Sequence, residues 1–297
     1  MTVKDLRINI GPGLRSLDVY SRREVLSRTN EGDLATSFKG RGVEFAGFRK
    51  YSPGDDAQRI DWKASMKTQD ILIREFEEFR NHNIFFLFDV SNSMIFGSGD
   101  KLKCEYAAEA IYILSDALIK TGDNVGLGMF SDTMHVKLLP DSGQETLSNM
   151  TKSLLNNENY GGDFDFKKAL TLSKSLLGEK TVIILVSDFI GLPKGWEKYL
   201  SMFDDSFEII GLMIRDPRDL ELPVQFGRYL LKDPYSDNNM YVDARKYVNT
   251  YKELVDKDIK YISSILKHSK GDFLLLRTDE EFLYKTIKFF NRRSYKH

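Results

Sequence analysis

The sequence predicts a doubly wound, mostly parallel α/β sheet with helices on both faces, a three-layer sandwich. Apolar runs at 84–88 and 181–186 lack polar alternation, which is typical of strands buried on both faces of a parallel sheet. Each run is followed by an acidic residue within two positions. Strands alternate with amphipathic helical segments over about 200 residues, and this alternation indicates a doubly wound sheet.

The first 80 residues predict an N-terminal extension that precedes the sheet. Residues 40–51 alternate polar and apolar side chains with glycines, which indicates a twisted or bulged strand. A turn follows at 52–56, then one helical turn at 58–65 and a strand-like stretch at 71–80. The charged stretch at 17–34 predicts short helices or an arm.

Residues 81–297 predict one α/β domain. After the strand that ends at Asp89, apolar residues recur at helical spacing over 101–120. An alternating segment at 134–139 follows the next strand closely and predicts an antiparallel edge strand. The turn-rich segment at about 215–242 predicts an inserted hairpin. The remaining strands are expected at 125–130, 208–214 and 272–276, and the remaining helices at 146–155, 166–177, 196–202, 244–267 and 280–291.

Composition narrows the function classes. Charged residues make up 29% of the 297 residues but balance to a net charge of −1, which disfavours nucleic-acid binding. The single cysteine, Cys104, fits a reducing compartment. No signal-peptide pattern and no run of ~18 apolar residues occurs, so we expect a cytoplasmic protein without a transmembrane segment. No feature predicts the oligomeric state.

Candidate ligands follow the two strands that end in aspartate. In the strand order 3-2-1-4-5-6, the strand before Asp89 neighbours the strand before Asp188, so both carboxylates face one crevice. Ser91 and Ser93 add hydroxyl oxygens from the loop after Asp89. Carboxylates and hydroxyls without sulfur or histidine suit Mg²⁺, with Mn²⁺ and Ca²⁺ as alternatives. Helix capping by the same residues is the competing interpretation. The pairing with Asp188 favours the metal-capable site.

The Asp89-Val-Ser91-Asn-Ser93 motif resembles the metal-binding opening of a von Willebrand factor A-type domain. Such domains usually present a Gly-Gly-Thr segment before the third helix, and its threonine binds the metal. Here the segment reads Tyr160-Gly-Gly-Asp-Phe-Asp165, so either Asp163 or Phe164 stands at the threonine position. Asp163 or Asp165 substitutes as a ligand, or metal affinity is low, or the site is vestigial. For Asp165 we favour a helix N-cap.

The block from Gly42 to Ser65, with its Gly-Asp-Asp and Arg-Ile-Asp-Trp segments, resembles the domain-of-unknown-function 58 family. Segments at 187–189, 216–217 and 278–280 extend the resemblance to about residues 35–290. It implies no established catalytic activity, and it implies a MoxR-type AAA+ ATPase as partner in a chaperone-like or metal-insertion system. By analogy with A-type domains, the metal engages a carboxylate of another protein. Many relatives carry N-terminal membrane spans, which this sequence lacks.

The same block supports two interpretations. It mixes both charge signs around Trp62, and an ion network that pins the extension to the sheet is favoured because mixed charges are usually structural. A docking surface for a partner is the alternative, since Trp and Arg are frequent interface anchors. Its candidate residues are Arg49, Arg59, Asp61 and Trp62.

The leading functional hypothesis is a metal-capable interaction module that works with an ATPase. The alternative is a Mg²⁺-dependent hydrolase or phosphatase that uses Asp89 and Asp188. The common phosphate-loop, nucleophile-elbow and zinc-protease motifs are absent from the sequence. The four histidines are scattered, and His82 lies at the end of its strand away from the crevice. An enzyme is therefore the less favoured hypothesis.

Overall fold

The computed structural model describes residues 6–8, 43–52, 55–56, 60–68, 70–78, 82–203, 207–224, 227–236 and 238–294. The chain divides into two compact units, and one of them spans Phe38–His82. The other contains the large sheet and every helix that covers it. The predicted arm at 17–34 lies outside the described residues.

The large sheet has six strands in the order β10-β7-β6-β3-β4-β5. All neighbours pair in parallel except β4 and β5, which form the predicted antiparallel edge. Numbered along the chain, this is the predicted order 3-2-1-4-5-6. The strands are β3 (Asn83–Asp89), β4 (Asn124–Phe130), β5 (Met134–Asp141), β6 (Thr181–Ser187), β7 (Phe207–Arg215) and β10 (Asp272–Arg277).

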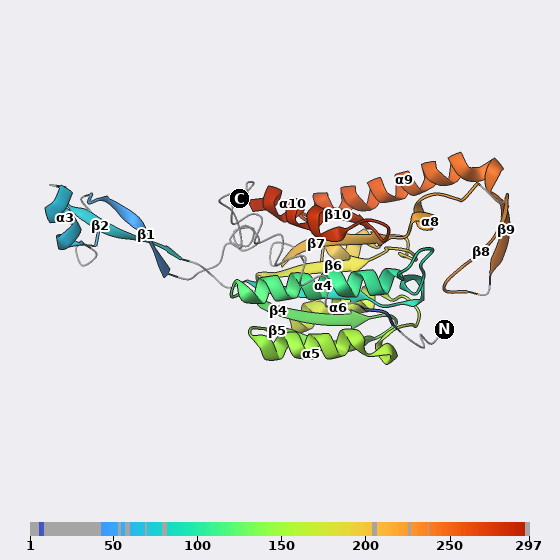
Figure 1. Cartoon of the computed structure of the whole chain (residues 1–297), viewed down its shortest axis with the longest axis horizontal. Coiled ribbons are helices and arrows are strands. Elements are labelled where there is room, and N and C mark those ends of the chain that lie inside the picture. The colour runs from blue at the N-terminus through green and yellow to red at the C-terminus, as the bar shows by residue number, and fades with distance from the viewer. Residues whose placement is uncertain are drawn as a thin grey trace. The chain divides into compact units, whose positions relative to one another are not determined.

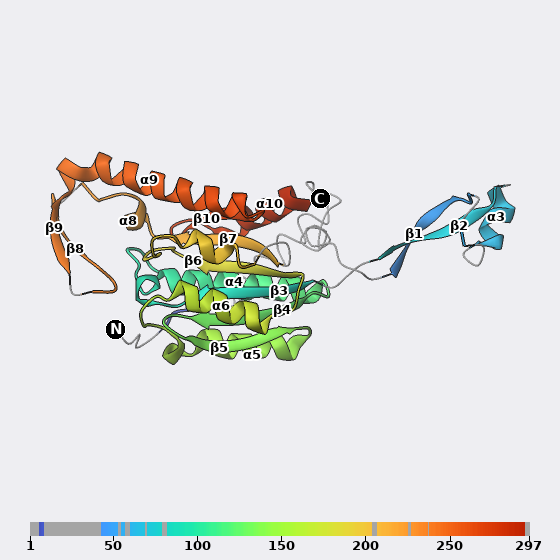
Figure 2. The same cartoon turned by 180° about the vertical axis from the view of Figure 1, so that it is seen from behind.

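Helices cover both faces of this sheet (Figures 1 and 2). On one face, α4 (Lys103–Lys120) packs beside α5 (Gln144–Leu155), and Tyr106 of α4 meets Phe282 of α10 (Phe282–Ser294) edge to face. The other face carries α6 (Phe166–Leu176), α7 (Glu197–Leu200) and α9 (Ala244–His268). The three-layer α/β fold class predicted from the sequence is confirmed.

The central strand β3 is buried on both faces because its side chains alternate between the two helical layers. Phe85 and Leu87 join a core cluster with Phe166 of α6, Leu200 of α7 and Leu266 of α9. The side chains of residues 84 to 88 are all fully buried. This explains why the strand carries an apolar run without alternation.

Two further elements shape the carboxyl edge of the sheet. The short helix α8 (Pro217–Leu220) follows β7 directly and begins with Pro217 in its first turn. The predicted inserted hairpin is formed by β8 (Arg228–Lys232) and β9 (Asn239–Asp243), which pair antiparallel. Its inner side chains pack against the start of α9 in a small cluster around Val242 and Ala244.

The unit from Phe38 to His82 contains a two-stranded sheet and one helix. Strand β1 (Val43–Lys50) pairs antiparallel with β2 (Leu72–Glu78), and the register shifts between Phe45 and Gly47. This shift confirms the predicted bulge. Helix α3 (Trp62–Thr68) begins later and runs longer than the single turn predicted at 58–65. The helix starts there because the Asp61 carboxylate accepts the Ala64 N–H at 2.9 Å, as an N-cap does.

Every helix that the structure describes is too short or too polar to cross a membrane.

Candidate functional site

The two candidate carboxylates lie at the ends of adjacent strands. Strands β3 and β6 are parallel, and Phe88 pairs with Val186. Asp89 is therefore level with Ser187, and Asp188 follows one residue further along. Both aspartates are fully buried. The two carboxylates that the strand order predicts to be neighbours thus lie at the carboxyl ends of adjacent strands.

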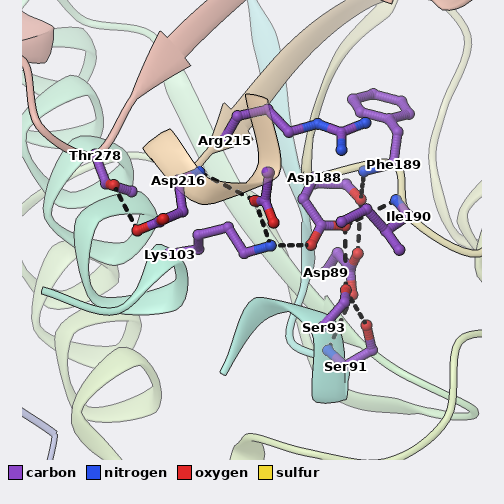
Figure 3. Close-up of polar contacts among 12 residues, drawn as sticks. Asp89, Ser91, Ser93, Lys103, Asp188, Phe189, Ile190, Arg215, Asp216 and Thr278 are labelled. Carbon is purple, nitrogen blue, oxygen red and sulfur yellow. Dashed lines mark hydrogen bonds and ion pairs between the residues drawn. The ribbon is translucent and has the colours of Figure 1, made fainter. Parts of the chain in front are cut away.

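The loop after β3 brings its two serines to the same place (Figure 3). The Ser91 N–H donates to Asp89 Oδ1 at 2.9 Å, and Ser93 Oγ donates to Asp188 Oδ1 at 3.1 Å. The two hydroxyl oxygens lie 3.4 Å apart, and both side chains are buried. One turn of 3₁₀-helix (Asn92–Met94) places Ser93 back over the sheet edge.

The loop after β6 is shaped by a backbone conformation that residues with side chains rarely adopt. Phe189 has φ of 56°, and this conformation costs on the order of 1 kcal/mol. It turns the chain so that Phe189 N–H donates to Ser187 Oγ and Ile190 N–H donates to Asp188 Oδ1, both at 2.8 Å. Ser187 in turn donates its hydroxyl to Asp89 Oδ2 at 2.6 Å. Both carboxylates are held in fixed orientations.

A buried lysine contacts the site. Lys103, in the first turn of α4, donates to Asp188 Oδ2 at 2.7 Å and to Asp219 Oδ2 at 2.8 Å (Figure 3). Its side chain is 1% exposed. Burial alone would lower the pKa of Lys103, but the two carboxylates outweigh that effect and raise it. Lys103 therefore stays charged and pairs with both carboxylates.

Among the described residues, no Lys or Arg side chain forms an ion pair with the Asp89 carboxylate, and the pKa of Asp89 reflects this. Burial, and then repulsion from Asp188, raises the pKa of Asp89 to about 7, despite hydrogen bonds from Ser187 and Ser91 that act in the opposite direction. Asp188 and Asp219 thus share the ammonium group of Lys103, and Asp89 adds a third carboxylate beside Asp188. The excess of negative charge in this region favours the binding of a further cation.

Asp216 ties the neighbouring loops together. Its carboxylate accepts hydrogen bonds from the Ser98 N–H at 2.8 Å, from the Ser98 hydroxyl at 2.6 Å and from the Thr278 hydroxyl at 3.3 Å. The loops after β3, β7 and β10 therefore share one fully buried side chain. This contact gives a structural reason for the segments at 216–217 and 278–280 noted in the sequence.

The third loop does not supply the missing hydroxyl. Asp165 is the N-cap of α6, since its carboxylate accepts the Lys168 N–H at 2.9 Å. Asp163 is exposed, in contrast to the four buried candidates. Phe164 packs against the rings of Phe130 and Phe166, with ring centroids 6.0 Å apart in each case. An aromatic side chain therefore occupies the part of the loop where A-type domains have threonine.

The donor set fits a hard divalent cation. Asp89 and Asp188 offer carboxylate oxygens, Ser91 and Ser93 offer hydroxyl oxygens, and oxygen ligands of this kind suit Mg²⁺, Mn²⁺ or Ca²⁺. Within the described ranges, no group of three or more His, Cys, Asp or Glu side chains forms a metal cluster. Hydroxyl oxygens, water or a partner's carboxylate would complete the coordination shell.

The candidate docking residues of the small unit differ in their contacts and in their exposure. Arg49 forms a bidentate pair with Asp55, at 2.7 and 2.8 Å, on the surface of this unit. Asp61 is the N-cap described above. Trp62 is 64% exposed, and Met66, one turn along α3, is 79% exposed. Arg59 lies outside the described residues. Trp62 and Met66 are thus both exposed on this unit.

The family of the chain follows from a comparison with family models. A model described as "Protein of unknown function DUF58" matches residues 47–258. The chain belongs to the DUF58 family. An uncharacterised protein of Mycobacterium tuberculosis is 23% identical over 290 residues, which cover 94% of the DUF58 chain and 88% of that protein. The uncharacterised YeaD protein of Bacillus subtilis is 26% identical over 99 residues, 33% of this chain and 23% of YeaD.

Solved structures of low sequence identity align with the chain. An aerotolerance-related membrane protein of Bacteroides fragilis aligns with a TM-score of 0.50 at 16% identity, covering 73% of the DUF58 chain and 100% of that structure. A von Willebrand factor type A protein of Catenulispora acidiphila aligns with a TM-score of 0.39 at 12% identity, covering 75% of this chain and 44% of the other. The first likeness agrees with the α/β fold described above.

Sequence reasoning missed several side chains of the site. Ser187 was visible only as the residue before Asp188, and Asp219 lies in the segment assigned to the insertion. Lys103 reads as a solvated lysine at the start of an amphipathic helix. Tyr235 lies on the hairpin turn, and its hydroxyl reaches Ser93 Oγ at 2.8 Å. Its place in the site depends on where the hairpin tip lies, and no local pattern encodes that.

Proposed function

We propose that this DUF58 protein is an interaction module that binds a partner protein through a metal ion held by Asp89, Ser91, Ser93 and Asp188. The observation that carries the proposal is the buried group of two carboxylates and two hydroxyls at the carboxyl ends of β3 and β6. Crevices at this edge are the usual ligand sites of open α/β sheets. The excess of carboxylates over ammonium groups makes a divalent cation favourable there.

Each residue has a defined part in this proposal. Asp89 and the two serines provide oxygens from a single loop, and their short spacing fixes the relative positions. Asp188 is oriented by Ser93, Ile190 and Lys103. Bound Mg²⁺ would supply an electrophilic point for a carboxylate of the partner. With few protein carboxylates, the partner's carboxylate becomes an important ligand, so binding of metal and partner would be coupled.

The partner we propose is a MoxR-type AAA+ ATPase, the class to which the family resemblance points. The test is a pull-down of the ATPase on the immobilised full-length chain, in Mg²⁺ and in EDTA. We expect retention in Mg²⁺, loss in EDTA and loss for Asp89→Ala. Asp163→Ala, which removes an exposed carboxylate of the third loop, should behave as wild type.

A thermal scan of the same proteins separates metal binding from partner choice. Mg²⁺ or Mn²⁺ should raise the melting temperature of the wild type and of Asp163→Ala, because a ligand that binds only the folded state stabilises it. The shift should vanish for Asp89→Ala. Equal shifts in all three proteins would contradict the metal site. A clear shift without any retained ATPase would contradict the partner alone.

The competing hydrolase hypothesis is decided with the same proteins. Among the described residues, a serine–histidine contact near the sheet edge joins Ser131 Oγ to His135 Nε2 at 2.7 Å. Ser131 is 1% exposed and so is shielded from substrate. Metal-dependent turnover of p-nitrophenyl phosphate that Asp89→Ala abolishes would favour the enzyme. We expect no turnover by the wild type.

A further inference from the structure

The tip of the β8–β9 hairpin reaches the two serines of the candidate site. The Tyr235 hydroxyl lies 2.8 Å from Ser93 Oγ, 2.9 Å from Ser91 Oγ and 3.3 Å from the carbonyl oxygen of Ile190. The serines precede Tyr235 by more than 140 residues in the chain. Both hydroxyls that would bind a metal are thus hydrogen-bonded to one phenol.

The surroundings of Tyr235 match the shape of its ring. Gly191 lies under the ring, and a Cβ at that position would come within 2.7 Å of Tyr235 Cε2. Phe164 packs against the ring on another side, with centroids 6.3 Å apart and planes at 32°. Phe164 is one of the two residues, with Asp163, that align with the metal-binding threonine of A-type domains. The third loop therefore contacts the tyrosine instead of providing a hydroxyl.

The hairpin tip holds Tyr235 in place through local contacts. Asp233 accepts the Tyr235 N–H at 3.0 Å and the Ser236 hydroxyl at 2.7 Å, and its own N–H donates to the Asn238 carbonyl at 3.1 Å. These bonds close a turn around the tyrosine. Among the described residues of the tip, Tyr235 provides the hydrogen bonds to the two serines, so movement of this turn would free both serine hydroxyls from the phenol.

We propose that Tyr235 is an intramolecular latch, which occupies the serine hydroxyls and must leave before metal and a partner's carboxylate can bind. The inference rests on the proposed function, since it describes access to the same site. A latch lowers the apparent affinity by the fraction of molecules in which the site is open. Loss of the hydrogen bonds of the phenol to the serines and of the ring contacts should raise that fraction about tenfold.

The experiment is a calorimetric titration of the full-length protein and its variants with Mn²⁺ alone. Tyr235→Ala should bind Mn²⁺ about tenfold more tightly than wild type. Tyr241→Ala is the matched control, because Tyr241 lies on the same hairpin and is 80% exposed. Its affinity should equal that of the wild type. Hydrogen exchange at residues 233–236 should be faster in Tyr235→Ala without metal, which gives a second readout that needs no ligand.

A pair of glycine variants tests the latch without touching the tyrosine. Gly191→Ala forces a methyl group against the ring, while Gly195→Ala has nothing within 4 Å. Both residues have positive φ, +87° and +78°, so both substitutions carry the same kind of backbone strain. Gly191→Ala should tighten Mn²⁺ binding and Gly195→Ala should not.

The outcomes separate the latch from the site itself. If wild type and Tyr235→Ala bind Mn²⁺ equally and Asp89→Ala abolishes both, the latch is wrong and the metal site stands. Weaker binding by Tyr235→Phe, which keeps the ring, would make the phenol a metal ligand and overturn the latch. If no variant binds Mn²⁺, the metal site and the latch both fail.

Discussion

At the scale of single residues, the site is governed by an imbalance of buried charge. Lys103 compensates Asp188 and Asp219, whereas Asp89 depends on two hydrogen bonds and lies beside another carboxylate. A buried carboxylate in such a position destabilises the fold when it ionises. We expect a site that binds a cation to lower the stability of the fold in this way when the cation is absent.

This cost predicts the effect of Asp89→Asn on stability. The pKa of Asp89 rises from 3.8 in the unfolded chain to about 7 in the fold. The native state therefore keeps its full stability below about pH 4 and loses stability as the pH rises toward 7. In EDTA at pH 7.5, Asp89→Asn should be more stable than wild type, by up to about 4 kcal/mol, with little difference near pH 4.

Urea denaturation at the two pH values measures this difference. Asp165→Asn is the control, because Asp165 is an exposed N-cap and asparagine caps helices equally well. It should change stability by less than about 0.5 kcal/mol at either pH. A destabilised Asp89→Asn at pH 7.5 would show that the ionised carboxylate is already compensated in the metal-free protein.

At the scale of elements, the central strands depend on a fit between β3 and β4. Gly128 of β4 pairs with Leu87, and the neighbouring Phe85 ring fills the space above the glycine. A Cβ on Gly128 would lie 2.7 Å from Phe85 Cζ, which is too close for any real contact. Phe85 is fully buried in the core cluster and has little room to move.

Gly128→Ala should therefore lower the free energy of unfolding by about 1–3 kcal/mol through overpacking. Gly178→Ala, at a position with nothing within 4 Å of the added methyl group, should change it by less than about 1 kcal/mol. Urea denaturation compares the two variants. Equal free energies of unfolding of the two variants would mean that β3 and β4 accommodate the methyl group of Gly128→Ala without loss of stability.

The strands of the sheet could be predicted from the sequence because a strand buried on both faces requires a run of consecutive apolar residues. The apolar run at 84–88 indicates a strand with two covered faces, and right-handed crossovers then fix which strands are neighbours. Lys103 shows the limit of such patterns. A lysine in the first turn of a helix looks solvated, and only contact with Asp188 and Asp219 explains its burial. Tyr235 likewise depends on a contact across more than 140 residues.

At the scale of the whole molecule, the two tryptophans report on different units. Trp196 is 4% exposed in the core beside Phe166, and Trp62 is 64% exposed on α3. A two-stranded sheet with one helix has little apolar surface of its own to bury, so an exposed Trp62 next to an exposed Met66 is a surface suited to a partner.

Fluorescence of Trp62→Phe tests this arrangement. The variant retains only Trp196, so its emission should shift to shorter wavelength and its quenching by acrylamide should fall severalfold relative to wild type. Addition of the partner ATPase to wild type should reduce quenching if Trp62 lies in the interface. Unchanged quenching on substitution would show that Trp62 is shielded in solution.

The inserted hairpin has a consequence for how this fold can diversify. The hairpin is inserted between β7 and β10, at the carboxyl edge of the sheet. Its tip reaches Ser91 and Ser93. A shorter or longer insertion would leave the six strands and their helices intact and change only what covers the serines. If Tyr235 acts as the proposed latch, the length of this one surface segment would set how readily the serines become accessible.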